Sequence, residues 1–383
     1  FRMTIIQIIT VFAVFQGTIL ALVLFLRRKG NLRANRWLAS LILAFMLGVV
    51  VIYVQHTDYY LLVPHFFVIS TSIIFLLGPF FFFYVRDLTS VKYKFRWVDA
   101  LNFTPFLLYV TILLIWIIPQ DTNTLVDHLK EMSDAVPKHP RFSLLPALKS
   151  LHLLIYTIVI LMILKKYSTQ IKNNFSNLDK INLRWLRYFV SIFICMQLVN
   201  YSLPYISYTI GGEDVWRKSD MVFGYFMAFF IFFAGYAGLV QPEIFTSDVV
   251  KTWIDLAEIS TVKSLPENNI DSKFHHKLVE EMRTNKLFLD NELSLSKLAD
   301  AVGVSPHQLS RLINSVEEKN FFEFVNYYRV QESMRMLADK SFNKFTIIQI
   351  AFDSGFNNKN SFNKAFKNIT GITPYEYKKQ HQG

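Results

Sequence analysis

Residues 345–370 read FTIIQIAFDSGFNNKNSFNKAFKNIT, and this stretch predicts two short helices joined by a tight turn. Thr346 followed by Gln349 is the pattern of a capping box, in which two side chains satisfy free backbone N–H groups at a helix start. Ala351 is small enough for a second helix to cross closely, and Gly355, four residues later, can take the positive φ that ends the first helix. The pattern is typical of a helix-turn-helix unit.

The same design occurs 52 residues earlier, in residues 293–315, which read LSLSKLADAVGVSPHQLSRLINS. Ala299 and Gly303 repeat the four-residue step, and Ser305 can cap the next helix while Gln308 completes a capping box. The turn between the two helices is one residue longer in the later copy. Two copies with matching caps favour a genuine pair of units over a coincidence.

The second helix of each copy has an inward apolar face and an outward polar face. Leu309 lies inward in the first copy and Phe362 in the second. Because this helix enters the major groove in such units, the outward side chains are the candidate DNA contacts: His307, Ser310, Arg311, Lys359, Asn360, Asn363, Lys364 and Lys367. Residues 321–339 predict a connecting helix about 28 Å long, which approaches the ~34 Å between successive major-groove faces.

Residues 291–380 resemble the AraC/XylS-type transcriptional regulators. The resemblance rests on the strings LADAVGVSPHQLSRLIN, NFFEFVNYYRVQESMRML and IAFDSGFNNKNSFNKAFKNITGITPYEYKK, of which the last is the most specific. It implies two recognition helices in adjacent major grooves, with DNA contacts at all of the outward residues given above except Lys367. Local pattern and resemblance together assign structural roles to Ala299, Gly303, Leu309, Ala351, Gly355, Phe362 and Pro374. Upstream, Leu77-Gly78-Pro79-Phe80 is similar to a motif of a subgroup with multi-span sensory N-termini.

Composition divides the chain into two regimes. Hydrophobic residues make up 52% and charged residues 18% of the 383 residues, and the apolar excess lies in the first two thirds. The net charge is +11, but residues 1–247 carry 22 Lys and Arg against 12 Asp and Glu, whereas residues 248–383 carry 18 against 17. The basic excess belongs to the apolar part, so it is weak evidence for DNA binding.

Seven apolar runs have the length, roughly 20 residues, that a helix needs to cross the hydrocarbon core of a membrane. We expect spans at Thr4–Leu26, Trp37–Val54, Leu61–Tyr84, Ala100–Ile118, Leu144–Leu164, Tyr188–Ile210 and Met221–Val240. The fifth run is the weakest, because Lys149 and His152 interrupt its start.

The charges of the loops between these runs indicate their orientation. Cytoplasmic loops collect Lys and Arg, and here the odd-numbered loops hold fifteen such residues and the even-numbered loops hold five. This alternation places the N-terminus outside and the chain from residue 242 onward inside. We therefore expect a multi-pass protein of the bacterial cytoplasmic (inner) membrane whose C-terminal domain lies in the cytoplasm.

The predicted fold class is all-α, a seven-helix transmembrane bundle followed by a soluble helical domain with two helix-turn-helix units joined by a long helix. The predicted domains are residues 1–241, a transmembrane sensor domain; residues 242–290, a cytoplasmic helical linker; and residues 291–383, the DNA-binding domain. Pro242 marks the end of the last span, because proline interrupts a helix.

Little in the predicted spans indicates transport, catalysis or metal binding. Few ionisable groups lie inside them, which disfavours ion-coupled transport, and metal-binding or nucleotide-binding motifs are missing from the sequence. We expect a protein that is not an enzyme, with no catalytic residue, no metal site and no cofactor. Cys195 is the only cysteine, which excludes an intrachain disulfide, and we expect it to be a small buried residue. Candidate signal-sensing residues are Gln16, His65, Gln197 and Asn200, although interhelical hydrogen bonding is the commoner role of such side chains.

These features favour a membrane-bound one-component transcriptional regulator whose spans sense a signal and control sequence-specific DNA binding. The expected partners are a double-stranded DNA operator, the lipid bilayer and a signal molecule of unknown identity. A homodimer is a further expectation, since regulators of this kind often bind paired sites. Two alternatives stay open: a membrane transporter or other integral membrane protein with a regulatory DNA-binding appendage, and a nonsensing membrane tether.

Overall fold

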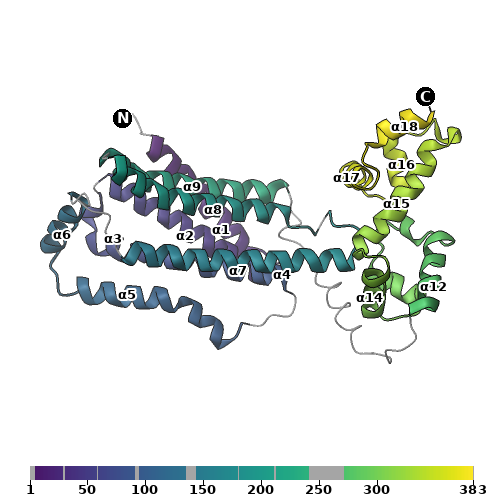
Figure 1. Cartoon of the computed structure of the whole chain (residues 1–383). Coiled ribbons are helices and arrows are strands. Elements are labelled where there is room, and N and C mark those ends of the chain that lie inside the picture. The colour runs from purple at the N-terminus through teal and green to yellow at the C-terminus, as the bar shows by residue number, and fades with distance from the viewer. Residues whose placement is uncertain are drawn as a thin grey trace. The chain divides into compact units, whose positions relative to one another are not determined.

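The computed structural model describes residues 5–28, 31–57, 59–90, 95–134, 144–179, 181–210, 213–240 and 271–382 (Figure 1). Every regular element in these ranges is a helix, and one isolated antiparallel bridge joins Phe175 to Ser294. The all-helical prediction is therefore confirmed for the described ranges. The chain divides into two compact units, which we call the apolar unit (Phe1–Leu164 and Leu183–Asp248) and the C-terminal unit (Lys165–Asn182 and Val249–Gly383).

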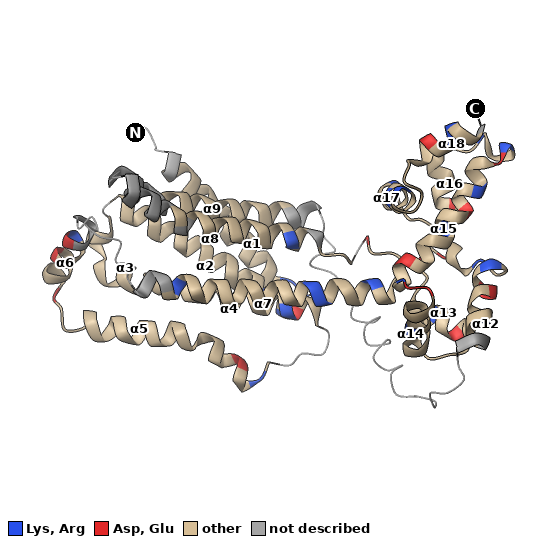
Figure 2. Ribbon diagram, viewed as in Figure 1, with Lys and Arg blue, Asp and Glu red and all other residues tan. Residues whose placement is uncertain are grey.

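The apolar unit is built from long helices that carry few charged residues along their length (Figure 2). Its elements are α1 (Ile5–Leu26), α2 (Leu32–His56), η1 (Tyr59–Leu62), α3 (Pro64–Ser70), η2 (Thr71–Ile73), α4 (Ile74–Thr89), η3 (Trp97–Phe103), α5 (Thr104–Ile117), α6 (Thr122–Asp134), the first part of α7 (Leu144–Asn174), α8 (Arg184–Ile210) and α9 (Glu213–Val240). Local signals set several helix starts. Asn31 caps α2 by accepting a hydrogen bond from the backbone N–H of Ala34, and Pro64 occupies the first turn of α3, where its missing N–H costs nothing.

Five helical segments in the described ranges are long and apolar enough to cross a membrane. They are Gln7–Leu26, Leu32–His56, Pro64–Thr89, Trp97–Ile117 and Leu148–Asn174, which correspond to the first five predicted spans. Two shorter apolar helical segments are Trp185–Val199, which overlaps the sixth predicted span, and Met221–Tyr236, which lies within the seventh. Side chains from 203 to 220 lie outside the described part, so the count of seven stays a prediction.

The interruptions in the fifth predicted span are accommodated by neighbouring helices. The Nζ atom of Lys149 lies 5.0 Å from the centre of the Tyr109 ring, a cation–π distance. The Nε2 atom of His152 lies 3.1 Å from the backbone oxygen of Phe75. Both polar groups therefore have contacts inside the apolar unit, which lowers the cost of placing them in a span.

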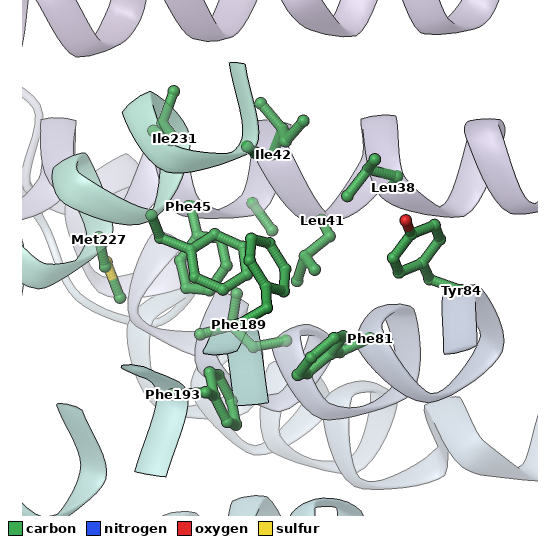
Figure 3. Close-up of a cluster of buried hydrophobic side chains, with 14 of the residues drawn as sticks. Leu38, Leu41, Ile42, Phe45, Phe81, Tyr84, Phe189, Phe193, Met227 and Ile231 are labelled. Carbon is green, nitrogen blue, oxygen red and sulfur yellow. The ribbon is translucent and has the colours of Figure 1, made fainter. Parts of the chain in front are cut away.

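Aliphatic and aromatic side chains from several helices form the core of the apolar unit (Figure 3). Phe81 of α4 and Phe193 of α8 are fully buried, and their rings meet edge to face with centroids 5.4 Å apart. Phe45 of α2 packs on Phe230 of α9 with centroids 4.3 Å apart. Most described positions on the outer faces of α1 and α5 are apolar and exposed, as expected of helices that contact lipid.

One buried ion cluster lies at the end of α4. Arg86, one of the fifteen residues in the loop-charge count, is buried within the helix rather than placed in a loop. Its guanidinium donates hydrogen bonds of 3.0 Å to Oδ1 of Asp87 and 3.0 Å to Oδ1 of Asp99, and the indole N–H of Trp37 donates to Oδ2 of Asp87 at 3.1 Å. Such mutual pairing is what a buried charge requires. Arg86 is therefore a packing residue here.

The burial predicted for Cys195 is also wrong. The thiol was expected to be buried, but Cys195 is exposed on α8. The expectation rested on the rule that apolar side chains avoid water, and that rule does not select one face of a helix that carries apolar side chains on several faces.

The C-terminal unit is a set of shorter helices around two cores. Its elements are the end of α7, α12 (Asp271–Arg283), η5 (Leu287–Leu289), α13 (Leu295–Val302), α14 (Pro306–Val316), α15 (Phe321–Ala338), η6 (Lys340–Phe342), α16 (Ile347–Asp353), α17 (Lys359–Thr370) and α18 (Pro374–Gln382). Phe321 and Phe324 at the start of α15 pack into the core with α12, α13 and α14, whereas Val330 and Leu337 farther along pack with α16 and α17. The α15 helix therefore contributes to both cores. Most of the predicted linker, residues 242–270, lies outside the described residues.

Candidate nucleic-acid interface

The first helix pair of the C-terminal unit, α13 and α14, is defined by its caps. Ser294 caps α13, and Gly303 ends it with a φ of +80°. The capping box predicted at Ser305 and Gln308 is confirmed: Ser305 Oγ accepts from the backbone N–H of Gln308, and Gln308 Oε1 accepts from that of Ser305. Pro306 occupies the first turn of α14. The local sequence thus sets the start, the end and the turn.

The α14 helix has the two faces that its sequence predicts. Leu309 and Leu312 are buried in the core that α13 and α12 share, together with Ala299. His307 and Arg311 are exposed, and Ser310 is partly exposed. These three polar residues therefore lie on the side of α14 that a partner can reach.

The second helix pair, α16 and α17, repeats the design. Thr346 and Gln349 form the predicted capping box at the start of α16. Gly355 follows with a φ of +89° and is itself buried, and Asn358 caps α17 by accepting from the backbone N–H of Ser361 at 2.8 Å. The turn is one residue longer than in the first pair, because the cap comes three residues after the glycine instead of two.

The α17 helix also separates apolar from polar side chains. Phe362 and Phe366 are fully buried with Ala351, and Pro374 at the start of α18 is buried. The outward polar residues Lys359, Asn360, Lys364 and Lys367 are exposed, and Asn363 is partly exposed. Residues 341–383 hold six lysines against Asp353 and Glu376, which gives this end of the unit a positive character.

The connecting helix α15 has 18 residues and is therefore about 27 Å long. Its start carries a third capping box, formed by Asn320 and Glu323, which the sequence analysis did not single out although its spacing is the same.

Arg329, in the middle of α15, is the hydrogen-bonding centre of the unit. Its guanidinium donates to the backbone oxygens of Phe288 and Asp290, each at 2.8 Å, and to Oγ of Ser176 at 3.1 Å. Burial lowers the pKa of Arg329 to about 10, and the Asp290 carboxylate opposes that shift. The group is still charged at neutral pH, so its donors need these acceptors.

Two residues from far upstream belong to this unit and were missed by sequence analysis. Ser176, which is buried, donates from Oγ to the backbone oxygen of Leu293 at 2.6 Å. Asp179 lies at the first turn of α17, where Oδ1 accepts from Oγ of Ser361 at 2.7 Å and Oδ2 accepts from the side-chain amide of Asn358. Both lie in the segment between the fifth and sixth predicted spans. The sequence signal for them was weak, because nothing local marks a contact across so many residues.

The candidate sensing residues are separated along the apolar unit. Gln16 packs against Gly235, Gln197 donates to Oγ1 of Thr157 at 2.9 Å, and His65 is partly buried on α3. Asn200 is helical, but its side chain lies outside the described part. Among the described side chains, Gln16, His65 and Gln197 do not share a common site. Within the described ranges, no group of three or more His, Cys, Asp or Glu side chains is placed to hold a metal ion.

Part of the C-terminal unit is similar to a known protein family. Residues 298–380 match a family model described as a helix-turn-helix domain. The chain is 32% identical over 93 residues to an uncharacterized HTH-type transcriptional regulator of Staphylococcus aureus strain COL, which covers 24% of this chain and 12% of the relative. It is 28% identical over 123 residues to the HTH-type transcriptional regulator ArgR of Pseudomonas aeruginosa, which covers 31% of this chain and 35% of the relative.

The similarity is thus confined to a minor part of each of these curated relatives, 12% and 35% of their lengths. No solved structure matches the chain.

Proposed function

We propose that this protein is a membrane-bound one-component transcriptional regulator that binds a double-stranded DNA operator through two helix-turn-helix units. The observation that carries the proposal is the repeated helix pair, α13 with α14 and α16 with α17, which the match to a helix-turn-helix domain model covers from residue 298 onward. In each pair the second helix buries apolar residues and presents polar ones. That arrangement suits a helix that lies in a major groove.

The two helices would contribute different contacts. On α14, Arg311 has the bidentate donors that recognise guanine, whereas His307 and Ser310 are less specific. On α17, Asn360 and Asn363 have the amide groups that pair with base edges, and the three lysines Lys359, Lys364 and Lys367 suit phosphates or base acceptors. Since α15 packs with both helix pairs, it would hold the two recognition helices in one register. A homodimer on paired sites would extend this arrangement.

The membrane location is supported by five helices of sufficient length and by the charge of the loops. Residues 165–182 also belong to the same compact unit as the helix-turn-helix segment. Two segments that pack together must lie on the same side of a bilayer. The charge rule assigns this loop to the cytoplasm. The C-terminal unit would then also lie in the cytoplasm. With the N-terminus outside, this location requires an odd number of spans.

The proposal also includes the sensing of a signal by the membrane spans. The buried ions Arg86, Asp87 and Asp99 are paired with one another, which is typical of packing and gives no support to the transporter alternative. A sensor and a tether differ in one property. Substitutions such as Gln197→Leu, which removes a hydrogen bond between α8 and α7, should change DNA occupancy in a sensor and leave it unchanged in a tether.

Chromatin mapping of the full-length protein, tagged after Gly383, tests the proposal. We expect discrete peaks that share a sequence motif, and loss of these peaks in the Arg311→Ala, Lys364→Ala double variant. The variant should stay in the membrane fraction, which controls for folding and insertion. A wild-type protein that yields no sequence-specific peaks would remove the regulator function.

A further inference from the structure

The loop that follows α7 ends on the proposed second recognition helix. Asp179 accepts two hydrogen bonds at the first turn of α17, from the side chains of Asn358 and Ser361, the cap residue and the third residue of the helix. These two residues flank Lys359 and Asn360, two of the proposed DNA contacts. Asp179 is itself partly exposed. It therefore lies at the edge of the surface that DNA would cover.

The position of the carboxylate matters because of the charge at a helix start. The first backbone N–H groups of a helix have no partner within it, and the aligned peptide dipoles make that end positive. A helix start therefore attracts anions, among them the phosphates of a nucleic acid. Asp179 brings a negative charge to this end of α17, where it competes with phosphate binding and repels the DNA backbone.

The other end of the same loop is fixed by buried contacts. Ser176 donates to the backbone oxygen of Leu293 and accepts from the guanidinium of Arg329, and Phe175 forms a bridge with Ser294. Ser176 and Arg329 are each 2% exposed. The anchor is thus inaccessible to solvent, whereas the Asp179 contact at the far end consists of two side-chain bonds near the surface. The loop therefore has one buried attachment and one attachment near the surface.

We propose that residues 175–179 form an autoinhibitory clasp in which Asp179 occupies the start of α17 and must leave before that helix binds DNA. This inference rests on the proposed DNA-binding function. The loop joins α7 to α8, so a change in the relative positions of those two helices would pull on the clasp directly. A signal in the membrane would reach the recognition helix through this loop, in addition to any route through residues 242–270.

The first test compares charge variants of the full-length protein in lipid nanodiscs. Asp179→Asn removes the negative charge, and Asp300→Asn is the matched control, because Asp300 is an exposed carboxylate on α13. The probe is a duplex recovered from a random-sequence pool by selection with the wild-type and Asp179→Asn proteins together. We expect Asp179→Asn to lower Kd about 10-fold and Asp300→Asn to change it less than 2-fold. An equal or higher Kd for Asp179→Asn overturns the clasp.

A second test locks the clasp. In a Cys195→Ser background, Asp179→Cys combined with Ser361→Cys places two thiols where the carboxylate and hydroxyl now meet, and the same sample is measured oxidised and reduced. The oxidised, cross-linked form should bind the selected duplex at least 10-fold more weakly than the reduced form. Equal binding by a fully cross-linked sample overturns the clasp.

The tests separate the clasp from the function on which it rests. If wild-type and variant proteins bind duplexes with the same salt-dependent Kd, the clasp is wrong and the regulator function stands. If none of the proteins retains any duplex from the pool, the proposed DNA binding itself is wrong and the clasp falls with it.

Discussion

The backbone oxygen of Phe288 accepts a hydrogen bond of 2.8 Å from Nε of Arg329, and this contact ties the middle of α15 to the segment that precedes the first helix pair. The same oxygen lies against Gly355 in the turn of the second pair: a Cβ atom added there would be 2.5 Å from it. Three parts of the C-terminal unit therefore meet at one carbonyl group. The relative placement of the two proposed DNA-reading helices depends on this junction.

Gly355→Ala should destabilise the C-terminal unit strongly. The new methyl group would meet backbone at a position whose φ is +89°, so conformational strain adds to overpacking and the loss should be about 3 kcal/mol. Gly371→Ala is the matched control, since its φ is +82° but nothing lies within 4 Å of the added atom. It should cost only about 1 kcal/mol. Hydrogen exchange of the α15 amides in the full-length protein measures both values. Equal losses would contradict the close packing at Gly355.

Arg329→Lys should also destabilise this unit, by about 3 kcal/mol, because an ammonium group cannot reach the separate acceptors that the guanidinium fork reaches. The control is Arg335→Lys on the same helix. Arg335 is largely exposed and pairs with Glu332, so its replacement should change stability by no more than about 1 kcal/mol. The readout is again exchange of the α15 amides. A tolerated Arg329→Lys change would mean that the guanidinium contacts contribute little to stability.

Phe362→Ala tests the core beneath α17, the proposed second recognition helix. Phe362 is fully buried, and its truncation should cost about 3–5 kcal/mol through lost burial and the cavity that remains. Phe352→Ala on α16 removes an aromatic ring that is 51% exposed, and should change stability by about 0.5 kcal/mol or less. Protease resistance of the C-terminal unit in the full-length protein distinguishes the two. Similar resistance of both variants would show that α17 does not pack as described.

Arg311→Ala and Lys364→Ala should each weaken binding to a selected duplex by roughly 1–3 kcal/mol if the side chains touch base edges. Loss at a base contact relaxes sequence preference, whereas loss at a phosphate contact weakens all sequences alike and lowers the salt dependence. Lys340→Ala, which removes a charge from η6, is the control and should have little effect. Unchanged Kd in both test variants would remove the site assignment and leave the fold intact.

Sequence reasoning succeeded where the determinants are local. The capping boxes at Ser305 and Thr346 involve residues three apart, and the positive φ of Gly303 follows from its position after a short helix. It failed where determinants are distant. Ser176 contacts Arg329 across 153 positions, and Asp179 contacts Ser361 across 182, so no local pattern could predict either pair.

The apolar unit shows a different limit of prediction from sequence. Hydrophobic length predicts which segments can cross a membrane, but it does not tell which face of each helix meets its neighbours. Arg86 was assigned to a loop although it lies buried within α4, and Cys195 was expected inside although it is exposed. Both errors arise because apolar side chains lie on both faces of such helices, which leaves no periodic signal to separate the core side from the outer side.

The most direct test of the central claim is the salt dependence of DNA binding by the full-length protein in lipid nanodiscs. Two recognition helices with their phosphate contacts should release several counterions, so Kd for a selected duplex should rise by about three orders of magnitude between roughly 50 and 200 mM salt. A protein that binds no duplex from a random pool, or binds with an affinity that salt does not change, would contradict the account.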